Sequence, residues 1–432
     1  MISSLSGIRG ILNKDLSLSD VSRFAANFAN ATGSSELLLA RDTRSTGEIL
    51  GRTISAALMS FGATVYEYGI ISTPALFRES RIRKLPAIMV TASHNEPEFN
   101  GLKFLVDGAG IGQELFERVT AEGTRSGEFA QGSLRTGRRA VYVDDLVGRF
   151  KEGSCDGMTI AVDLGGGAAI SHTTQLLRRL GCRVVSINDA YGVFNRKVDP
   201  VSDDLTLLRK IVKDEGCDIG LGFDCDGDRL VIVDPAGRKR TGDYMLSLAL
   251  SEMAAETGEK KVVVSMDTTQ AVDDVVKKLG GRVFRAKVGE ANVVGMMREK
   301  GARLGGEGSS GGLIDGSFNY CRDSMLAALS IITALKKKGR KFYDSVPVYH
   351  QTRVALAISK ARALRGIGKL GASYEGADPT DGLKIFLPNR SWVLLRPSGT
   401  EDVVRVSAEA PSEEKAKKIV GTFSKRLKEL SS

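Results

Sequence analysis

Leu37-Leu-Leu-Ala-Arg-Asp42 is an apolar run that ends in an aspartate, and the pattern returns in Met158-Thr-Ile-Ala-Val-Asp163 and Lys261-Val-Val-Val-Ser-Met-Asp267. Each run has the length and composition of a buried strand. A stretch with the character of a helix follows each run, at residues 49–61, 170–180 and 271–279. Strands that alternate with helices are typical of α/β folds with parallel or mixed sheets. The recurrence therefore predicts three similar α/β units.

The carboxy-terminal part of the chain differs in character from these units. Its predicted strands follow one another without intervening helices, at residues 383–387, 392–395 and 403–406. A terminal helix is predicted after Ser412, a good N-cap that is followed by Glu413 and Glu414 in the first turn. This pattern indicates a smaller α+β domain.

Polar stretches mark the joints between the units, at residues 151–157, 235–242 and 336–341. A chain of 432 residues is long enough for several domains with separate cores. We therefore expect an α/β fold with three similar domains on mixed sheets and a smaller C-terminal α+β domain. The predicted spans are residues 1–152, 153–241, 242–345 and 346–432.

The composition is that of a soluble globular protein, with 42% hydrophobic and 26% charged residues. The five cysteines are odd in number and show no C-x-x-C spacing, which favours a reducing compartment over disulfide or zinc frameworks. The sequence starts without the pattern of a secretory signal, and its longest apolar stretch, residues 325–335, is too short to span a bilayer. We therefore expect a cytoplasmic protein with no membrane partner.

The net charge of +9 is mild for this length. Nucleic-acid binding favours aromatic residues among Lys and Arg, and only 6% of the residues are aromatic. A site for a small anionic substrate explains the surplus of positive charge equally well. We therefore expect no nucleic-acid partner.

Thr91-Ala-Ser-His-Asn95 is the first loop with chemical potential. It follows a predicted strand at residues 86–90, so Ser93 lies near a strand end, where it can act as a nucleophile or phosphate carrier. His94 is adjacent in sequence and is expected to point elsewhere, and no G-x-S-x-G elbow is present. A hydrolase triad is therefore not expected.

A second strand is predicted behind this loop, at residues 102–106. Asn100-Gly101 is expected to form the turn between the two strands, because this dipeptide favours tight turns. Lys103 is a cation in an otherwise apolar strand, which places positive charge near the serine loop.

Phe223-Asp-Cys-Asp-Gly-Asp-Arg229 lies between two predicted strands. Its three alternating aspartates can point at one centre, and close carboxylates repel by about 4 kcal/mol per pair at an effective dielectric constant of about 20. A divalent cation removes this repulsion, and all-oxygen ligands select Mg²⁺ or Ca²⁺. The spacing does not fit an EF-hand, so Mg²⁺ completed by a phosphate oxygen is the preferred interpretation.

Two further loops are rich in ligand-binding residue types. Arg396-Pro-Ser-Gly-Thr-Glu401 combines a guanidinium, hydroxyls and a glycine, which suits an anion receptor at a strand end. Gly305-Gly-Glu-Gly-Ser-Ser-Gly-Gly312 has glycines that allow close approach of a ligand, and a carboxylate and serines that can bind sugar hydroxyls. Alone, the second loop also fits a flexible turn.

In their order along the chain, with Ser6-Gly-Ile-Arg-Gly10 first and Arg396–Glu401 last, these motifs resemble the α-D-phosphohexomutase superfamily. The resemblance covers the chain from Ser6 to about Ala410. It implies four domains around a central cleft and an intramolecular phosphotransferase, an isomerase that interconverts hexose or hexosamine 6-phosphate and 1-phosphate. It further implies an enzyme phosphoserine, a bisphosphate intermediate, one Mg²⁺ per active site and hexose 1,6-bisphosphate as activator.

The resemblance assigns roles to individual residues. Ser93 matches the phosphorylated serine, whose phosphate also ligates the metal together with Asp224, Asp226 and Asp228. The matched residues around the transferring phosphoryl group are Arg9, Lys103 and Arg229, of which Lys103 is a candidate general base or acid. The matched sugar-binding residues are Glu307 with Ser309 or Ser310. The matched residues around the other phosphate are Arg396, Ser398, Gly399 and Thr400.

One departure from the family pattern concerns the sugar loop. Many relatives carry a histidine shortly after the loop serine, whereas Gly311 and Gly312 stand here. The loop also has one more residue than the common pattern, so Ser309 and Ser310 are not separated by alignment. The altered loop keeps a second hypothesis open, a catalytically weakened sugar-phosphate binding or regulatory protein.

The resemblance leaves the physiological sugar open. Phosphoglucosamine mutase and phosphomannomutase/phosphoglucomutase are both expected activities, and a pentose phosphate is a further alternative. The expected partner is a small phosphosugar, and the expected assembly is a monomer or a homodimer.

Overall fold

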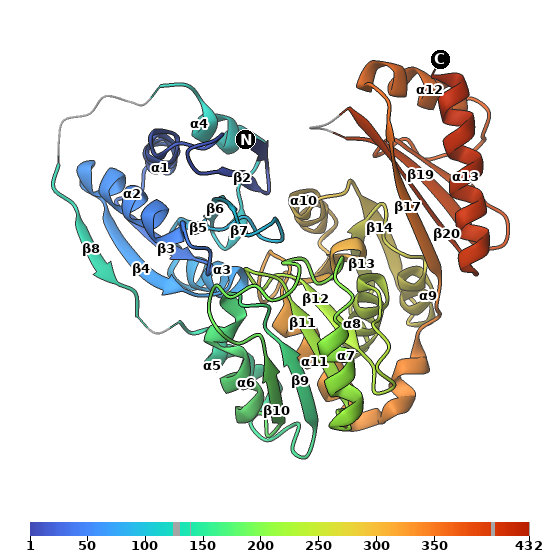
Figure 1. The fold of residues 1–432 in the computed structure, drawn as a ribbon, viewed down its shortest axis with the longest axis horizontal. Coiled ribbons are helices and arrows are strands. Elements are labelled where there is room, and N and C mark those ends of the chain that lie inside the picture. The colour runs from blue at the N-terminus through green and yellow to red at the C-terminus, as the bar shows by residue number, and fades with distance from the viewer. Residues whose placement is uncertain (124–129, 139, 399–401, 432) are drawn as a thin grey trace.

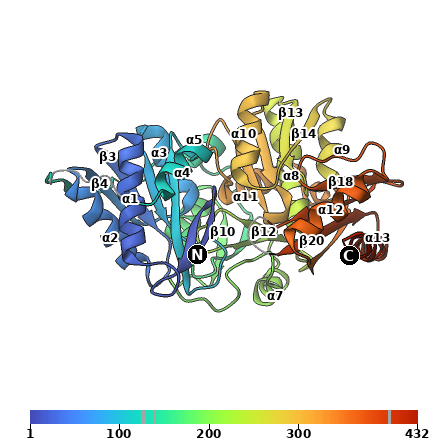
Figure 2. The ribbon, with the colours of Figure 1, turned by 90° about the horizontal axis from the view of Figure 1, so that it is seen from above.

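The computed structural model describes residues 1–123, 130–138, 140–398 and 402–431. Four units follow one another along an arc, from the amino-terminal unit in blue to the carboxy-terminal unit in red (Figure 1). Seen from above, the first and the last unit lie at opposite ends of the molecule (Figure 2). The expected fold, three α/β units with mixed sheets and a smaller fourth unit, is confirmed.

The first unit is built on one eight-stranded sheet. Its strands are β1 (Ile2–Ser4), β2 (Gly7–Ile11), β3 (Glu36–Arg41), β4 (Thr64–Ile70), β5 (Ala87–Val90), β6 (Phe99–Val106), β7 (Ala109–Gly110) and β8 (Ser133–Thr136). Its helices are α1 (Leu18–Thr32), α2 (Gly47–Ser60), α3 (Thr73–Arg83) and α4 (Gln113–Thr120). The strand order is β1-β2-β6-β5-β3-β4-β8, with β7 paired to β6.

The second and third units each contain a four-stranded sheet, with strand orders β10-β9-β11-β12 and β14-β13-β15-β16. The second unit comprises α5 (Tyr142–Phe150), β9 (Thr159–Asp163), α6 (Thr173–Arg179), β10 (Arg183–Ile187), α7 (Thr206–Asp214), β11 (Ile219–Phe223) and β12 (Leu230–Val233). The third comprises α8 (Gly242–Thr257), β13 (Lys261–Ser265), α9 (Ala271–Lys278), β14 (Arg282–Ala286), α10 (Glu290–Lys300), β15 (Leu304–Glu307), β16 (Gly312–Asp315) and α11 (Ser324–Lys338).

One topology is repeated in the three α/β units. The first strand of each repeat, β3, β9 or β13, lies between a second and a third strand that run parallel to it. A fourth strand, β6, β12 or β16, then runs antiparallel to the third. The three first strands come from the repeated apolar runs of the sequence, so the predicted similarity of the units has a structural counterpart.

The connection between the third and fourth strand carries the chemistry in every repeat. Ser93 lies between β5 and β6, the three aspartates lie between β11 and β12, and the Gly/Ser loop lies between β15 and β16. Because these connections are topologically equivalent, they emerge at the same edge of each sheet. The units follow an arc, and side-chain contacts then join the three loops.

The fourth unit has an antiparallel sheet with the order β17-β20-β19-β18. It comprises β17 (His350–Ala357), α12 (Lys360–Gly371), β18 (Leu383–Leu387), β19 (Ser391–Pro397), β20 (Val403–Ala410) and α13 (Glu413–Leu430). The hydroxyl of Ser412 caps α13 as predicted, by accepting a hydrogen bond from the Lys415 backbone. Sequence analysis did not predict β17, an edge strand with mostly exposed side chains, or α12.

The second and third units share one hydrophobic core, to which α5, α8 and α11 contribute. The apolar stretch at residues 325–335 is buried there as part of α11. Among the described residues, no helix combines the length and apolar character needed to cross a bilayer.

The predicted turn at Asn100-Gly101 is wrong, because both residues lie inside β6. Gly101 pairs with Arg9 of β2, and a Cβ atom at this position would come within 2.1 Å of the Ile8 carbonyl oxygen. The glycine therefore serves the close approach of neighbouring backbones rather than a turn. The actual connection between β5 and β6 is formed by residues 91–98.

We predict that Gly101→Ala destabilises the first unit, because the added methyl group overlaps backbone that cannot rotate away. Overpacking of this kind costs about 1–3 kcal/mol of unfolding free energy, which urea denaturation would measure. Gly110→Ala is the matched control, since nothing lies within 4 Å of its added Cβ atom. Equal stability of the two variants would contradict this interpretation.

Candidate active site

Ser93 is completely buried in the connection between β5 and β6, with its backbone in the left-handed region at φ 54°. A serine adopts this conformation only where its surroundings hold it. Arg44 supplies this support, because its Nη2 atom donates to the carbonyl oxygens of Ser93 and Asn95, each at 2.7 Å. Its Nη1 atom donates to the carbonyl oxygen of Phe99 at 2.8 Å. One guanidinium therefore holds the backbone on both sides of the serine.

Asp42, the aspartate after the first strand of the first repeat, anchors this support. It pairs with the Nε atom of Arg44 at 3.1 Å and accepts a hydrogen bond from the Thr91 hydroxyl at 2.6 Å. The Thr91 hydroxyl oxygen accepts in turn from the Ser93 backbone N–H at 2.8 Å. The strand-aspartate pattern in this repeat therefore positions the serine.

Asp224, Asp226 and Asp228 are buried beside Ser93. Each contributes a carboxylate oxygen to a group whose atoms lie within 4.8 Å of one another, in agreement with the alternating spacing. The Ser93 hydroxyl donates to Asp224 Oδ2 at 3.3 Å. The serine of the first unit and the carboxylates of the second therefore form one site.

Two cations from different units bind the Oδ2 atoms of Asp226 and Asp228. Lys103 Nζ lies 2.6 Å from Asp226 Oδ2 and 3.0 Å from Asp228 Oδ2. Arg322, which precedes α11 of the third unit, donates to Asp228 Oδ2 at 2.8 Å. Burial opposes ionisation of Asp228, but Arg322 and Lys103 outweigh it and hold the pKa of Asp228 well below its usual range.

The pKa values of Lys103 and Asp224 are raised, in contrast to that of Asp228. Burial disfavours the Lys103 ammonium, yet Asp226 and Asp228 together raise the pKa of Lys103 above its ordinary value. Burial and the two neighbouring carboxylates raise the pKa of Asp224. The two carboxylates therefore hold Lys103 as a cation in this arrangement.

The inner oxygens of the carboxylates fit a metal ion. Asp226 Oδ1 and Asp228 Oδ1 are buried and have no hydrogen-bond partner among the residues that the structure describes. Buried oxygens of ionised carboxylates require a donor or a cation. Lys103 and Arg322 bind the Oδ2 atoms, so the Oδ1 atoms remain as possible metal ligands. Ligands that are all oxygen suit Mg²⁺.

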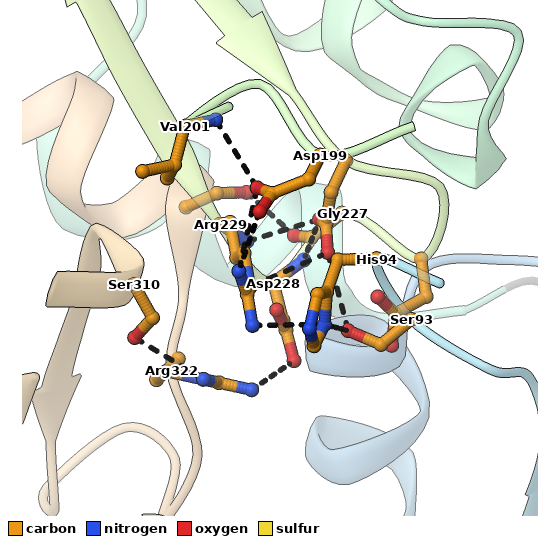
Figure 3. A network of polar contacts seen from close by, with 12 residues as sticks. Ser93, His94, Asp199, Val201, Gly227, Asp228, Arg229, Ser310 and Arg322 are labelled. Atoms are coloured by element: carbon orange, nitrogen blue, oxygen red, sulfur yellow. Dashed lines mark hydrogen bonds and ion pairs between the residues drawn. The ribbon is translucent and has the colours of Figure 1, made fainter. Parts of the chain in front are cut away.

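The expectation that His94 points away from the site is wrong. Arg229 Nη2 lies 2.8 Å from His94 Nδ1, which must accept the hydrogen bond because a guanidinium has only donors. Burial and the charge of Arg229 lower the pKa of His94 to about 2, so the ring is neutral. Figure 3 shows His94 between Ser93 and Arg229. The turn after Ser93 directs the ring back toward the metal loop.

Arg9 and Arg229, the other cations that the resemblance assigns to the transferring group, also lie near Ser93. Arg9 Nη1 donates to Asn95 Oδ1 at 2.9 Å, which brings β2 to the serine loop. Burial lowers the pKa of Arg9 to about 10, so the side chain stays charged at neutral pH. Arg229 Nη1 lies 3.3 Å from Asp199 Oδ1. Arg9 thus contacts the serine loop through Asn95, and Arg229, which belongs to the metal loop, contacts the serine loop through His94.

Arg322 also joins the Gly/Ser loop of the third unit to the metal loop. Its Nη1 atom lies 3.2 Å from Ser310 Oγ and 3.4 Å from Glu307 Oε2. Glu307 additionally accepts a hydrogen bond from the Gly289 backbone N–H at 2.7 Å, and burial raises the pKa of Glu307. Glu307 and Ser310 thus share a partner with Asp228.

Ser309 faces the fourth unit rather than Arg322. It lines a pocket of about 360 Å³ together with Arg353, Arg396 and Arg405. Arg396 lies in β19 and pairs through Nε with Asp381 Oδ2 at 2.9 Å. Ser398, which directly follows β19, is buried. Ser309 and Ser310 therefore have different surroundings, although alignment could not distinguish them. Gly399 and Thr400 lie outside the described residues.

Three supporting residues escaped sequence analysis: Arg44, Thr73 and Arg322. Thr73, at the start of α3, donates through its hydroxyl to Asp226 Oδ2 at 2.6 Å. The signal for Arg44 was its place two residues after the first repeated aspartate. The sequence gives no comparable signal for Arg322, whose role depends on how the units are assembled.

The comparisons with known proteins agree with this geometry. Models of the phosphoglucomutase/phosphomannomutase alpha/beta/alpha domains I, II and III match residues 2–128, 140–237 and 241–351, and the C-terminal domain model matches residues 352–425. A protein of Methanopyrus kandleri named "Probable phosphoglucosamine mutase" is 31% identical over 97% of this chain and 96% of its own length. This chain belongs to the phosphoglucomutase/phosphomannomutase family.

Further members of the family support the assignment. A "Phosphoglucomutase/phosphomannomutase" of Thermococcus kodakarensis is 32% identical over 98% of this chain and 97% of its own length. A crystal structure of a family protein from Burkholderia thailandensis superposes with a TM-score of 0.87, at 26% identity, and covers 99% of this chain and 98% of that one. The predicted superfamily and the predicted enzyme class, a phosphohexomutase, are confirmed.

We predict that Arg44→Met destabilises the protein and loosens the serine loop, because it leaves the buried Asp42 without its cation. Breaking one side of a buried ion pair costs about 3–5 kcal/mol of unfolding free energy. Urea denaturation measures this loss, and hydrogen exchange should increase at residues 91–98. Arg52→Met, which removes an exposed pair with Glu48, is the control and should leave both measurements unchanged. Wild-type exchange in the Arg44 variant would contradict the supporting role.

Proposed function

We propose that this protein is a Mg²⁺-dependent phosphosugar mutase that interconverts hexose or hexosamine 6-phosphate and 1-phosphate. The observation that carries the proposal is the position of the Ser93 hydroxyl, 3.3 Å from Asp224 in a buried group of three carboxylates. A buried serine beside a cation site, with arginine and lysine around it, suits transfer of a phosphoryl group. Ser93 is proposed as the residue that carries this group.

In the proposed reaction, a hydroxyl oxygen of the sugar monophosphate attacks the phosphorus of phosphorylated Ser93. The bond between phosphorus and Ser93 Oγ breaks, and Oγ takes up a proton equivalent to the one that the sugar hydroxyl releases. The resulting bisphosphate reorients and returns its other phosphoryl group to Ser93. Arg9, Lys103 and Arg229 hold the transferring group, and Mg²⁺ at the three aspartates supplies neutralisation of its developing charge.

The other units are proposed to hold the rest of the substrate. Glu307 with Ser309 or Ser310 binds sugar hydroxyls, and Arg396 with Ser398, Gly399 and Thr400 binds the phosphate that is not being transferred. An anion site remote from Ser93 can serve both orientations of the bisphosphate, because either phosphate can occupy it. Hexose 1,6-bisphosphate is the proposed activator, since it can phosphorylate Ser93 directly.

The relatives do not decide between sugars, because their names include both phosphoglucosamine mutase and phosphoglucomutase/phosphomannomutase. The protein, primed with glucose 1,6-bisphosphate, should therefore be given the α-1-phosphates of glucosamine, glucose, mannose and ribose. We expect turnover of at least one hexose or hexosamine phosphate. Binding without turnover of any of them would instead favour the sugar-phosphate binding protein.

We predict that Ser93→Ala abolishes turnover and the phosphate that mass spectrometry detects at this position, because no other hydroxyl occupies the place of Oγ. The free energy of unfolding, measured with urea, should stay within about 1 kcal/mol of the wild type, since only two long hydrogen bonds are removed, to Asp224 at 3.3 Å and to His94 at 3.5 Å. Ser251→Ala, on α8 away from the site, is the control for serine removal. Near-normal turnover of the Ser93 variant would refute the phosphocarrier role.

We predict that chelation of divalent cations abolishes turnover and that Mg²⁺ restores it. The thermal unfolding temperature should rise when Mg²⁺ is added, because the ion binds the native carboxylates and not the unfolded chain. Asp226→Asn should remove this Mg²⁺-dependent rise, since it takes away one ligand charge. Full turnover of the metal-free protein would contradict the proposed site.

A further inference from the structure

Arg322 is buried where three units meet, with only 7% of its surface exposed. Its guanidinium lies between the metal loop and the Gly/Ser loop, at 2.8 Å from Asp228 and 3.2 Å from Ser310 (Figure 3). Its Nε atom lies 3.3 Å from Glu290 at the start of α10. No other described arginine contacts both a carboxylate of the metal loop and the Gly/Ser loop.

Gly312 makes room for this side chain, and Gly311 beside it is restricted by backbone. A Cβ atom added at Gly312 would lie 2.2 Å from Cδ and 2.4 Å from Cγ of Arg322, so the arginine stem fills the space of a side chain there. The preceding Gly311 has φ +65°, and a Cβ atom there would lie 2.3 Å from the Leu230 carbonyl oxygen. Position 312 therefore cannot carry a side chain while Arg322 is in place, and position 311 is restricted to glycine by its own backbone conformation and by Leu230.

The Arg322 stem therefore accounts for the glycine at position 312, in the region that many relatives give to a histidine. A different segment supplies a positive charge to the Gly/Ser loop, because Arg322 lies just before α11 and contacts Ser310 and Glu307. Its fork of donors can hold two partners at once, which the single ammonium of a lysine does with less geometric definition.

We propose that Arg322 is a positioning residue that locks the sugar-binding loop to the metal loop and thereby sets the sugar relative to Ser93. This inference rests on the proposed function for the identity of the sugar loop. One edge of the guanidinium fixes Ser310 and Glu307, and the other fixes the Oδ2 atom of Asp228, which leaves Oδ1 for the metal. The same guanidinium is a positive charge close to the metal ligands, so it opposes cation binding while it orders the loop.

This dual effect separates a positioning role from a merely structural one. Loss of the fork misplaces the sugar and lowers kcat, whereas loss of the charge strengthens metal binding. A residue that only stabilised the fold would weaken both properties together. Arg322→Met removes charge and fork, and Arg322→Lys removes the fork but keeps the charge.

The experiment measures kcat, KM and the Mn²⁺ dissociation constant of the dephosphorylated protein for these variants. We expect kcat to fall by about 100-fold in both, because small displacements of reacting groups have effects of this size. The dissociation constant for Mn²⁺ should fall by about tenfold in Arg322→Met and stay within twofold in Arg322→Lys. Arg78→Met is the matched control, since it removes an arginine that joins the first and third units away from the site.

Gly312→Ala tests the contact directly, because it introduces the methyl group that Arg322 excludes. Alone, it should lower kcat to the level of the Arg322 variants by displacing the guanidinium. In the Arg322→Met background, where the flexible side chain can move aside, it should add less than a threefold effect. Thermal unfolding of the four proteins in this cycle should show the same lack of additivity.

Turnover of Arg322→Lys within threefold of the wild type would overturn the inference, as would weaker Mn²⁺ binding in Arg322→Met. Additive effects of Gly312→Ala and Arg322→Met on kcat or on thermal unfolding would also overturn it. If Gly312→Ala folds poorly, the Mn²⁺ and kcat measurements on the two Arg322 variants still decide. Absence of turnover in the wild type would instead refute the proposed function. The Mn²⁺ measurements and the unfolding cycle would still decide whether Arg322 couples the two loops.

Discussion

Three carboxylates buried side by side are the constraint on which the rest of the site depends. Asp224, Asp226 and Asp228 come from one short loop, yet the second unit alone does not neutralise them. Lys103 reaches them from the first unit and Arg322 from the third. The electrostatic balance is therefore complete only when three units are assembled, so the requirement for neutrality also ties the units together.

A repeated fold makes this assembly economical. The same connection, between the third parallel strand and the antiparallel fourth, bears a serine in the first unit, carboxylates in the second and a Gly/Ser loop in the third. The backbone supplies equivalent positions, and the side chains differ. Chemical roles are thus distributed over copies of one scaffold, and the fourth unit adds the arginines of a different sheet.

Much of this arrangement could be predicted from the sequence because its signals are local. Apolar runs gave the central strands, and the alternation of Asp224, Asp226 and Asp228 gave their convergence. Asn100-Gly101 was misinterpreted because the dipeptide's preference for turns was overridden by the close packing of three strands. Arg322 could not be found, since its partners lie up to 94 residues away in sequence and meet it only through the packing of the units.

The mutual exclusion between a side chain at Gly312 and the stem of Arg322 has a consequence for divergence within such families. If the arginine at position 322 is introduced first, its stem overlaps the side chain at position 312. If glycine is introduced at position 312 first, this overlap does not occur. The order of the two changes therefore matters. Transplanting the loop between relatives would require moving both positions as a pair.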